Sequence, residues 1–362
     1  MAFDITSIWR QRGPGALLLW PVSCLFGALV ALRRLGYRQG WWSATRLAVP
    51  VLVVGNRIVG GAGKTPTTIA ILAHLQADGW RPGVLTRGYK AEASRHPRPL
   101  LLDAGSQADL TAQDTGDEPL LIWRRTAVPV MIDPLRVRGG QALLDRHPEI
   151  DILVCDDGLQ HLPLRRDIEV IVYDERGQGN GWLLPAGPMR EPLTTTPTPG
   201  LVAPPIVLYN ASAPSTPLRG HCARRSAAPL VALQTWWQGA PSPHSTTPIL
   251  TPAQQGTEPI WALAGIAQPD RFFTELKAQG WRIHGLPLPD HADLSELPWP
   301  LEVAHVFVTE KDAVKLSPDE VRRQRPHTTV WVVSLNFQPE PAFWTALDLA
   351  LARLPRPAPS ND

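Results

Sequence analysis

The feature that most constrains this chain is an apolar run that leads into a glycine-rich turn and then into a helical pattern. Residues 48–54 (AVPVLVV) have the composition of a strand that is buried on both faces. GNRIVGGAGKT follows at 55–65, and an apolar stripe over 64–77 predicts a helix. This order of strand, turn and helix is the context that a phosphate-binding loop requires.

The turn supplies the groups that hold the phosphates of a nucleotide. Its glycines let backbone N–H groups turn inward, and the helix that follows adds the positive end of its dipole. Lys64 is placed to reach the β- and γ-phosphates, and the hydroxyl of Thr65 is placed to bind Mg²⁺. The residues expected to contact the nucleotide are Gly60, Gly61, Ala62, Gly63, Lys64 and Thr65. The strict motif has Gly where this chain has Ile58, so the loop is a variant.

Further strand and helix patterns alternate along the chain. Strands are expected at 83–86, 128–132, 151–157, 168–174, 206–209, 260–266, 305–309 and 328–333, and helices at 117–125, 136–147, 270–279 and 343–354. This rhythm predicts an α/β fold: a doubly wound parallel sheet like that of P-loop NTPases, a second, smaller α/β domain, and an N-terminal membrane-associated helix. The predicted parts are a hydrophobic segment at 1–40, a nucleotide-binding domain at 41–210, a Pro-rich connection at 211–258, a C-terminal α/β domain at 259–355 and a disordered tail at 356–362.

An apolar strand that ends in two carboxylates forms the second motif, DILVCDDGLQH at 151–161. Asp156 and Asp157 are expected at the carboxyl end of the strand, where α/β sheets bind ligands. Two carboxylates this close repel one another unless a cation is present, and Mg²⁺ is the cation that a P-loop uses. Adjacent aspartates often form only a solvated turn, but the upstream loop favours a metal site. The sequence leaves open which of the two contacts the metal.

Several single residues are weaker candidates. Arg87 in TRGYK (86–90) and Arg190 in NGWLLPAGPMREP (180–192) could clamp phosphate oxygens, although a loop arginine is more often a solvated charge. Asp117 in GDEP could accept a proton from an attacking hydroxyl, but an Asp at a helix start is more often an N-cap. His291 in LPDHAD could orient that base, although alone it would be an ordinary surface histidine.

The N-terminal segment favours attachment to a membrane. Residues 13–32 carry no charge, and arginines stand on both sides of them. A helix of this length reaches about 30 Å, the thickness of a bilayer core. Pro21 would kink or restart it, and a helix beginning there would lie in the interface, with tryptophans nearby. A cleaved signal peptide is disfavoured because no small-residue cleavage site follows, and a buried core helix is the third alternative. Whether the segment spans the bilayer stays open.

Composition narrows the classes of partner. The net charge of +2 argues against a dedicated nucleic-acid binder. The three cysteines have neither paired nor metal-like spacing, so neither a disulfide framework nor a zinc site is indicated.

Taken in order, the motifs resemble those of the tetraacyldisaccharide 4'-kinases, the lipid A 4'-kinases of Gram-negative bacteria. The similarity runs over roughly residues 15–320 through VGNRIVGGAGKTP, LTRGYK, GDEP, DDGLQH, GNGWLLPAGPMREP, LAGIAQPDRFF, LPDHAD and TEKDAVKL. DDGLQH and LPAGPMREP are far more specific to this family than the phosphate-binding loop is.

The resemblance implies transfer of the γ-phosphate of ATP, with Mg²⁺, to the 4'-hydroxyl of a tetraacyldisaccharide 1-phosphate, which gives lipid IVA in lipid A biosynthesis. It also implies two α/β domains with the site between them, a lipid A precursor disaccharide as partner, and a place at the cytoplasmic face of the inner membrane. The sequence gives no indication of protein partners or oligomeric state.

The resemblance also assigns roles to residues. It makes Asp117 the catalytic base and His291 its partner, with Lys64 and Arg190 beside the phosphates. It gives Thr65, Asp156 and Asp157 to the metal, and Arg87, Gln160, His161 and Glu191 to the surroundings of the nucleotide. Two positions depart from the family: Ile58 stands where a Ser or Thr is usual, and Ala292 where a second His is frequent.

Two rival functions belong to other classes. A P-loop ATPase or GTPase of the metal-chaperone or switch type would bring Cys or His clusters, or an Asn-Lys-x-Asp motif, and the sequence contains neither. A non-catalytic, membrane-bound nucleotide sensor would bind ATP yet tolerate loss of Asp117. Turnover with and without an acceptor lipid separates the three.

Overall fold

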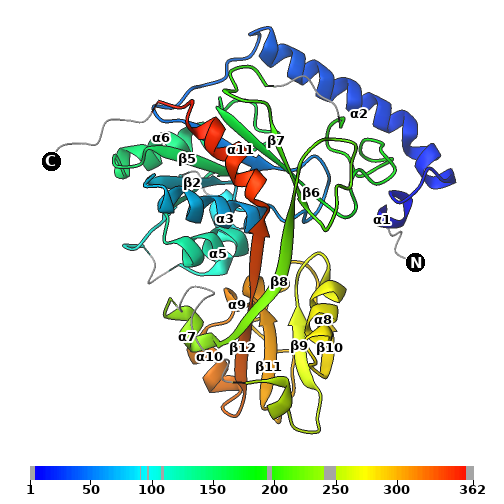
Figure 1. Cartoon of the computed structure of the whole chain (residues 1–362), viewed down its shortest axis with the longest axis vertical. Coiled ribbons are helices and arrows are strands. Elements are labelled where there is room, and N and C mark those ends of the chain that lie inside the picture. The colour runs from blue at the N-terminus through cyan, green and yellow to red at the C-terminus, as the bar shows by residue number, and fades with distance from the viewer. Residues whose placement is uncertain are drawn as a thin grey trace. The chain divides into compact units, whose positions relative to one another are not determined.

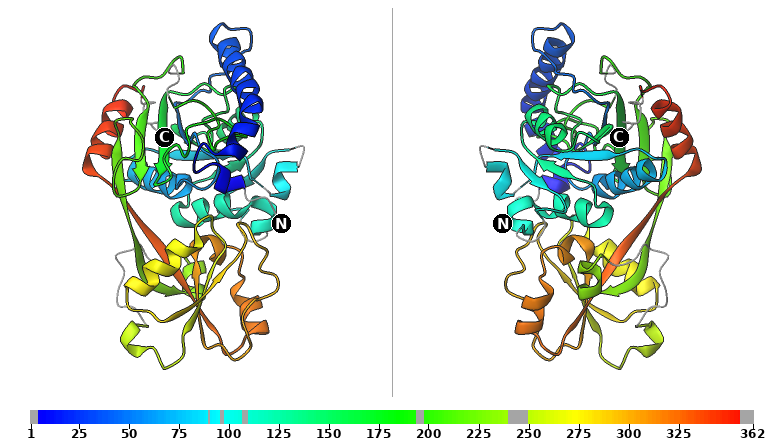
Figure 2. Two further views of the ribbon diagram at one scale, coloured as in Figure 1. Left: turned by 90° about the vertical axis from the view of Figure 1, so that its right-hand side faces the viewer. Right: turned by 90° about the vertical axis from the view of Figure 1, so that its left-hand side faces the viewer.

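The computed structural model describes residues 5–89, 91–95, 98–106, 110–193, 198–239 and 250–355. The chain forms two compact units. The first unit consists of residues 1–87, 133–224 and 338–362, and the second of residues 88–132 and 225–337. Figure 1 shows the elements of each, and Figure 2 shows them from two further sides.

The first unit is built on a parallel sheet. Its strands are β1 (Val51–Gly55), β2 (Pro82–Thr86), β5 (Ile152–Asp156), β6 (Ile168–Asp174), β7 (Ile206–Asn210) and the start of β8 (His221–Ala232). They are ordered β8-β7-β6-β1-β5-β2, with every pairing parallel. All residues of β1, β5 and β6 are buried, as expected for strands that helices cover on both faces.

Among the described residues, the helices of the first unit are α1 (Ile5–Ile8), α2 (Pro14–Arg38), α3 (Lys64–Ala77), α6 (Arg136–Arg146) and α11 (Pro341–Leu351). Helices α3 and α11 contact one another, because the ring of His74 stacks on that of Trp344 with centroids 4.4 Å apart. The central strand β1 lies between β6 and β5, so the loop that follows it emerges at the middle of the sheet.

Helix α2 runs without interruption through Pro21, so of the two expected effects of that proline, a kink or a restart, the restart is wrong. Contacts along α2 hold it to the segment 180–191: the hydroxyl of Ser23 donates to the carbonyl of Leu183 at 2.7 Å. These contacts stabilise the helix although Pro21 lacks the backbone N–H that would donate within it. By length and hydropathy this helix could cross a membrane, and 11% of its most apolar window is buried in the protein. Figures 1 and 2 show it beside the loops of the first unit.

The second unit is also built on parallel strands. Strands β9 (Ile260–Ala264), β10 (Ile283–Pro287), β11 (His305–Thr309) and β12 (Thr329–Pro339) are ordered β10-β9-β11-β12. Strands β3 (Leu100–Leu102) and β4 (Val130–Ile132) form an antiparallel pair. The helices are α4 (Ala112–Thr115), α5 (Asp117–Thr126), α7 (Leu233–Trp237), α8 (Pro269–Ala278), α9 (Glu310–Ala313) and α10 (Pro318–Gln324), with 3₁₀ turns at Glu92–Arg95 and Pro252–Gln254. The aromatic side chains of Phe272, Trp281, Phe307 and Trp331 contribute to the core.

The two units divide the chain differently from the predicted parts. Residues 88–132 belong to the second unit, because α5 packs on α9. The stretch 211–258, expected to be a connection of long loops, contains the twelve-residue strand β8 and helix α7. Strand β8 leads from the first unit into the second, and its sequence, HCARRSAAPLVA, lacks the alternation that would have predicted it. The tail at 356–362 and Lys90 of the TRGYK motif lie outside the described residues.

Candidate functional site

The glycine-rich loop has the backbone of a phosphate cradle. Gly60 and Gly63 have φ of 95° and 89°, values that glycine adopts without steric cost. The hydroxyl of Thr67 donates to the carbonyl of Gly63 at 2.8 Å. The side-chain amide of Asn56 donates to the carbonyl of Gly60 at 3.1 Å. Two carbonyls of the loop are thereby held by side chains, which fixes its conformation.

Arg176 braces the loop from outside. Its guanidinium is paired with Asp174 at the end of β6, at 2.8 Å. The same group donates to the carbonyls of Val59 and Gly61, each at 3.3 Å. Arg176 precedes the GNGWLLPAGPMREP block and was not predicted as a site residue.

Ile58 lies in an apolar cluster at the glycine-rich loop. Its side chain is buried with Ala62 and Met189, and Leu183 and Leu193 pack against this cluster. The departure from the usual Ser or Thr is thus matched by apolar packing between the loop and the segment that contains Arg190.

The two carboxylates at the end of β5 have different surroundings. Asp156 is 1% exposed, and one of its oxygens accepts a hydrogen bond from the hydroxyl of Thr68 on α3 at 2.7 Å. The side chain of Asp157 is 36% exposed, and it lies 3.7 Å from the ammonium of Lys64 and 3.2 Å from the guanidinium of Arg190. The structure therefore brings the lysine, the second aspartate and the arginine together.

These cations decide the charge of Asp157. Burial raises the pKa of its carboxyl, but Lys64, Arg190 and Arg136 together outweigh burial and hold the pKa below its ordinary value. Arg136, which the sequence reasoning missed, is 6% exposed and donates to the carbonyl of Asp157 at 3.3 Å. In the sequence, Arg136 was marked only by its place at the start of the helix expected at 136–147.

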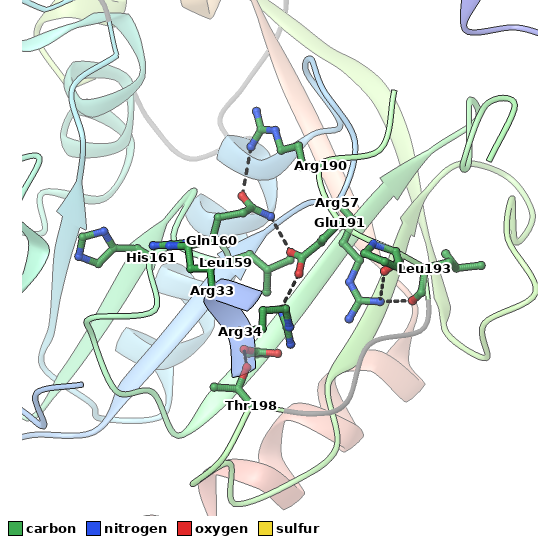
Figure 3. A network of polar contacts seen from close by, with 12 residues as sticks. Arg33, Arg34, Arg57, Leu159, Gln160, His161, Arg190, Glu191, Leu193 and Thr198 are labelled. Atoms are coloured by element: carbon green, nitrogen blue, oxygen red, sulfur yellow. Dashed lines mark hydrogen bonds and ion pairs between the residues drawn. The ribbon is translucent and has the colours of Figure 1, made fainter. Parts of the chain in front are cut away.

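Gln160 and Glu191 lie in a network next to this cluster (Figure 3). The amide of Gln160 donates to Glu191 at 2.8 Å and to the carbonyl of Asn56 at 3.0 Å. Its oxygen accepts a longer contact, 3.4 Å, from Arg190. Glu191 also accepts from Arg34 of α2 at 2.6 Å.

His161, the last residue of DDGLQH, is uncharged at neutral pH. Burial, followed by the positive charges of arginines led by Arg136 and Arg166, lowers the pKa of its imidazole to about 4. Arg166 is 2% exposed and donates to the carbonyls of Leu159 and His161, so it holds the turn after the acidic pair. Arg87 follows β2, is exposed, and contributes to the same positive field.

The residues predicted for Mg²⁺ suit a hard cation. Thr65, Asp156 and Asp157 offer only oxygen donors, which is the preference of Mg²⁺. Within the described ranges no group of three His, Cys, Asp or Glu side chains could hold a metal ion. An incomplete set fits Mg²⁺ at a nucleotide, because this ion takes most of its ligands from phosphates and water.

In the second unit, Asp117 and His291 form a pair. Asp117 is the first residue of α5 and is 7% exposed, and one of its oxygens lies 3.0 Å from Nδ1 of His291. His291 has a φ of 64° in the left-handed region, which a His adopts only where its surroundings hold it. The ring of Tyr89 lies 5.6 Å from the imidazole. Two weak candidates, 174 residues apart in sequence, thus meet.

Lys311 completes this pair and was missed as a site residue. Its ammonium lies 3.5 Å from Nε2 of His291, 2.8 Å from Asp290 and 3.5 Å from Glu118. Burial lowers the pKa of Lys311, but the carboxylates of Glu118 and Asp290 outweigh burial and raise it, so the lysine stays charged. The TEKDAVKL block, quoted above among the motifs that resemble the kinase family, contains Lys311, but no role was predicted for this lysine.

The parallel sheet with its glycine-rich loop, Lys64 and acidic pair defines the class: this is a P-loop α/β protein. Residues 15–352 match the LpxK family, tetraacyldisaccharide-1-P 4'-kinase. The tetraacyldisaccharide 4'-kinase of Methylibium petroleiphilum is 52% identical over 97% of this chain and 94% of that protein. The corresponding kinase of Leptothrix cholodnii is 51% identical over 99% and 98%. The chain belongs to the tetraacyldisaccharide 4'-kinase family.

A solved structure has the same fold. The crystal structure of the "apo" form of LpxK from Aquifex aeolicus in complex with ATP matches with a TM-score of 0.71, over 93% of this chain and 98% of that chain. Sequence identity is 23%, so the likeness concerns the fold. It bears out the α/β architecture expected from the sequence.

Proposed function

We propose that this chain transfers the γ-phosphate of ATP to the 4'-hydroxyl of tetraacyldisaccharide 1-phosphate, which yields lipid IVA. The observation that carries the proposal is the cluster of Lys64, Asp157 and Arg190 at the phosphate-binding loop, in a chain of this kinase family. A guanidinium and an ammonium beside such a loop are the groups that stabilise negative charge on a transferring phosphoryl group.

On the nucleotide side, the residues act by position and charge. The N–H groups of the loop from Gly60 to Gly63 and the start of α3 bind the phosphates, Lys64 contacts the β- and γ-phosphates, and Arg190 clamps phosphate oxygens. Arg87 and His161 border the same region. Because His161 is neutral, it can accept or donate a hydrogen bond without adding charge.

Thr65 and Asp157 would hold Mg²⁺, and Asp156, whose carboxylate is engaged by Thr68, would support that site. When bound, the ion neutralises charge on the β- and γ-phosphates during transfer.

On the acceptor side, we assign the base to Asp117. Lys311, which has only donors, faces Nε2 of His291, so this nitrogen is the acceptor and Nδ1 carries the proton. Nδ1–H then donates to Asp117 and orients its side chain. The carboxylate takes the proton of the sugar hydroxyl as the oxygen attacks phosphorus. The alanine at position 292, where the family frequently has a second His, leaves the pair of Asp117 and His291 complete.

Helix α2 would hold the enzyme on the membrane surface. Its apolar side chains are exposed on one side, while Ser23 and Arg34 are held by the first unit. A helix fixed along the body of the protein lies in the interface rather than across the bilayer. Since the substrate is a lipid and ATP is cytosolic, we place the protein at the cytoplasmic face of the inner membrane.

The test measures transfer of labelled γ-phosphate from ATP to tetraacyldisaccharide 1-phosphate in detergent micelles. Labelled lipid is expected from the wild type, with a loss of about 10²- to 10⁴-fold in kcat for Asp117→Asn and unchanged affinity for ATP. Asp270→Asn, which alters an acidic residue at the start of α8, is the matched control. Phosphate released to water without a lipid product would refute the kinase, and full activity of Asp117→Asn would refute the assigned base.

A further inference from the structure

Helix α2 is linked to the nucleotide cluster by an unbroken series of polar contacts, all within the first unit (Figure 3). Arg34 on α2 donates to Oε2 of Glu191 at 2.6 Å. Oε1 of Glu191 accepts from the amide of Gln160 at 2.8 Å. The oxygen of that amide faces Arg190 at 3.4 Å, and Arg190 contacts Asp157 at 3.2 Å.

The orientation of the Gln160 amide couples Glu191 to Arg190. Its nitrogen has two acceptors, Glu191 and the carbonyl of Asn56, so its oxygen must face Arg190. If Glu191 did not hold the nitrogen, the amide could turn and present a donor to the guanidinium. A donor cannot pair with a guanidinium, so Arg190 would lose this contact.

Arg34 determines which cation Glu191 attracts. Glu191 is 2% exposed, and a buried carboxylate requires a positive partner. Arg34 provides that partner from α2. Without it, the buried Arg166 still acts on Glu191 from a fixed position. Arg190, which Gln160 already holds close, is the more exposed cation that Glu191 would draw away from Asp157.

We propose that Arg34 and Glu191 are positioning residues through which the seating of α2 sets the orientation of Arg190 at the nucleotide. The inference rests on the proposed function, in which Arg190 clamps phosphate oxygens. An enzyme whose membrane helix is displaced would then bind ATP poorly, so ATP turnover would be coupled to correct attachment at the membrane.

Arg34→Met tests the coupling, with Arg38→Met as the matched control from the exposed last turn of the same helix. Two quantities are measured in detergent: KM for ATP in the transfer reaction, and Kd for a fluorescent ATP analogue. Arg34→Met should raise both about tenfold, the effect of one weakened hydrogen bond to a charged group. Arg38→Met should leave both unchanged, and Arg34→Lys, which keeps the charge, should recover most of the loss.

The combination with Arg190→Met separates positioning from a general loss of stability. If Arg34 acts through Arg190, adding Arg34→Met to Arg190→Met should raise KM and Kd no further. Additive effects, or Arg34→Met values within twofold of wild type, would overturn the proposal. A wild type that binds the analogue but transfers no phosphate to lipid would refute the proposed function, while the Kd values would still decide the coupling.

Discussion

The exposed apolar face of α2 should determine how tightly the protein binds a lipid surface. Leu18, Leu25 and Leu29 are 81%, 63% and 57% exposed. Their spacing of seven and four residues places them on one side of the helix. Replacing all three by Ser removes this surface, while the contacts of Ser23 and Arg34 with the first unit are unaltered.

The magnitude follows from the exposed fractions. Full burial of a Leu side chain is worth about 1.5–3 kcal/mol, so side chains exposed to this degree contribute about 1–2 kcal/mol each when a membrane covers them. The triple variant should lose about 3–6 kcal/mol of binding free energy, which lowers the partition coefficient at least about a hundredfold.

Co-sedimentation with vesicles that contain anionic lipid measures this partition coefficient. Leu349→Ser is the control, because Leu349 on α11 is also 63% exposed and also lies on a helix of the first unit. The control should bind vesicles like the wild type. Equal binding by the triple variant and the wild type would refute the assignment of this face to the membrane.

Three further perturbations have defined outcomes. The pKa of His161 is lowered from 6.5 to about 4, so between these pH values the unfolded state binds more protons than the folded state. The free energy of unfolding should therefore fall as the pH drops from about 6.5 to about 4. Urea titrations should show a smaller fall for His161→Gln than for the wild type. Ile58→Thr should lower stability by about 1–3 kcal/mol without tightening ATP binding, because the hydroxyl would be buried against Met189; thermal denaturation and nucleotide titration check both effects. Arg125→Met should cost about 3–5 kcal/mol in chemical denaturation, because Glu310, held by Arg125 at 2.6 Å, would remain as a buried charge.

Each of these outcomes has a result that contradicts it. For His161→Gln it is a pH dependence equal to that of the wild type, and for Ile58→Thr it is a gain in ATP affinity. Arg323→Met is the control for Arg125→Met: its pair with Glu320 is exposed, so a similar loss in both variants would show that the buried pair contributes nothing of its own.

Local sequence patterns predicted the parts of the site that lie close together in the chain. The strand, the loop and helix α3 were expected because buried strands form continuous apolar runs and a tight phosphate cradle requires glycines. The acidic pair was expected at the end of a strand for the same reason, and β5 ends at Asp156. Strand β8 was missed because its burial comes from neighbours distant in sequence rather than from its own alternation.

Contacts between distant segments had no local signal. No sequence pattern pointed to Arg136, Arg166 or Arg176, because the contacts that give them a role form only in the fold. Lys311 was overlooked for the same reason.

The sequence by itself determined the class of this protein, since phosphate binding requires glycines, a lysine and carboxylates at short, fixed spacings. Only the tertiary structure decided how these groups are supported. The pairing of Asp117 with His291, the packing of Ile58 and the contact of Arg34 with Glu191 each join segments far apart in the chain. Buried polar groups require hydrogen-bond partners, and buried apolar groups require close packing. Only the folded arrangement of the chain decides which residue supplies each partner.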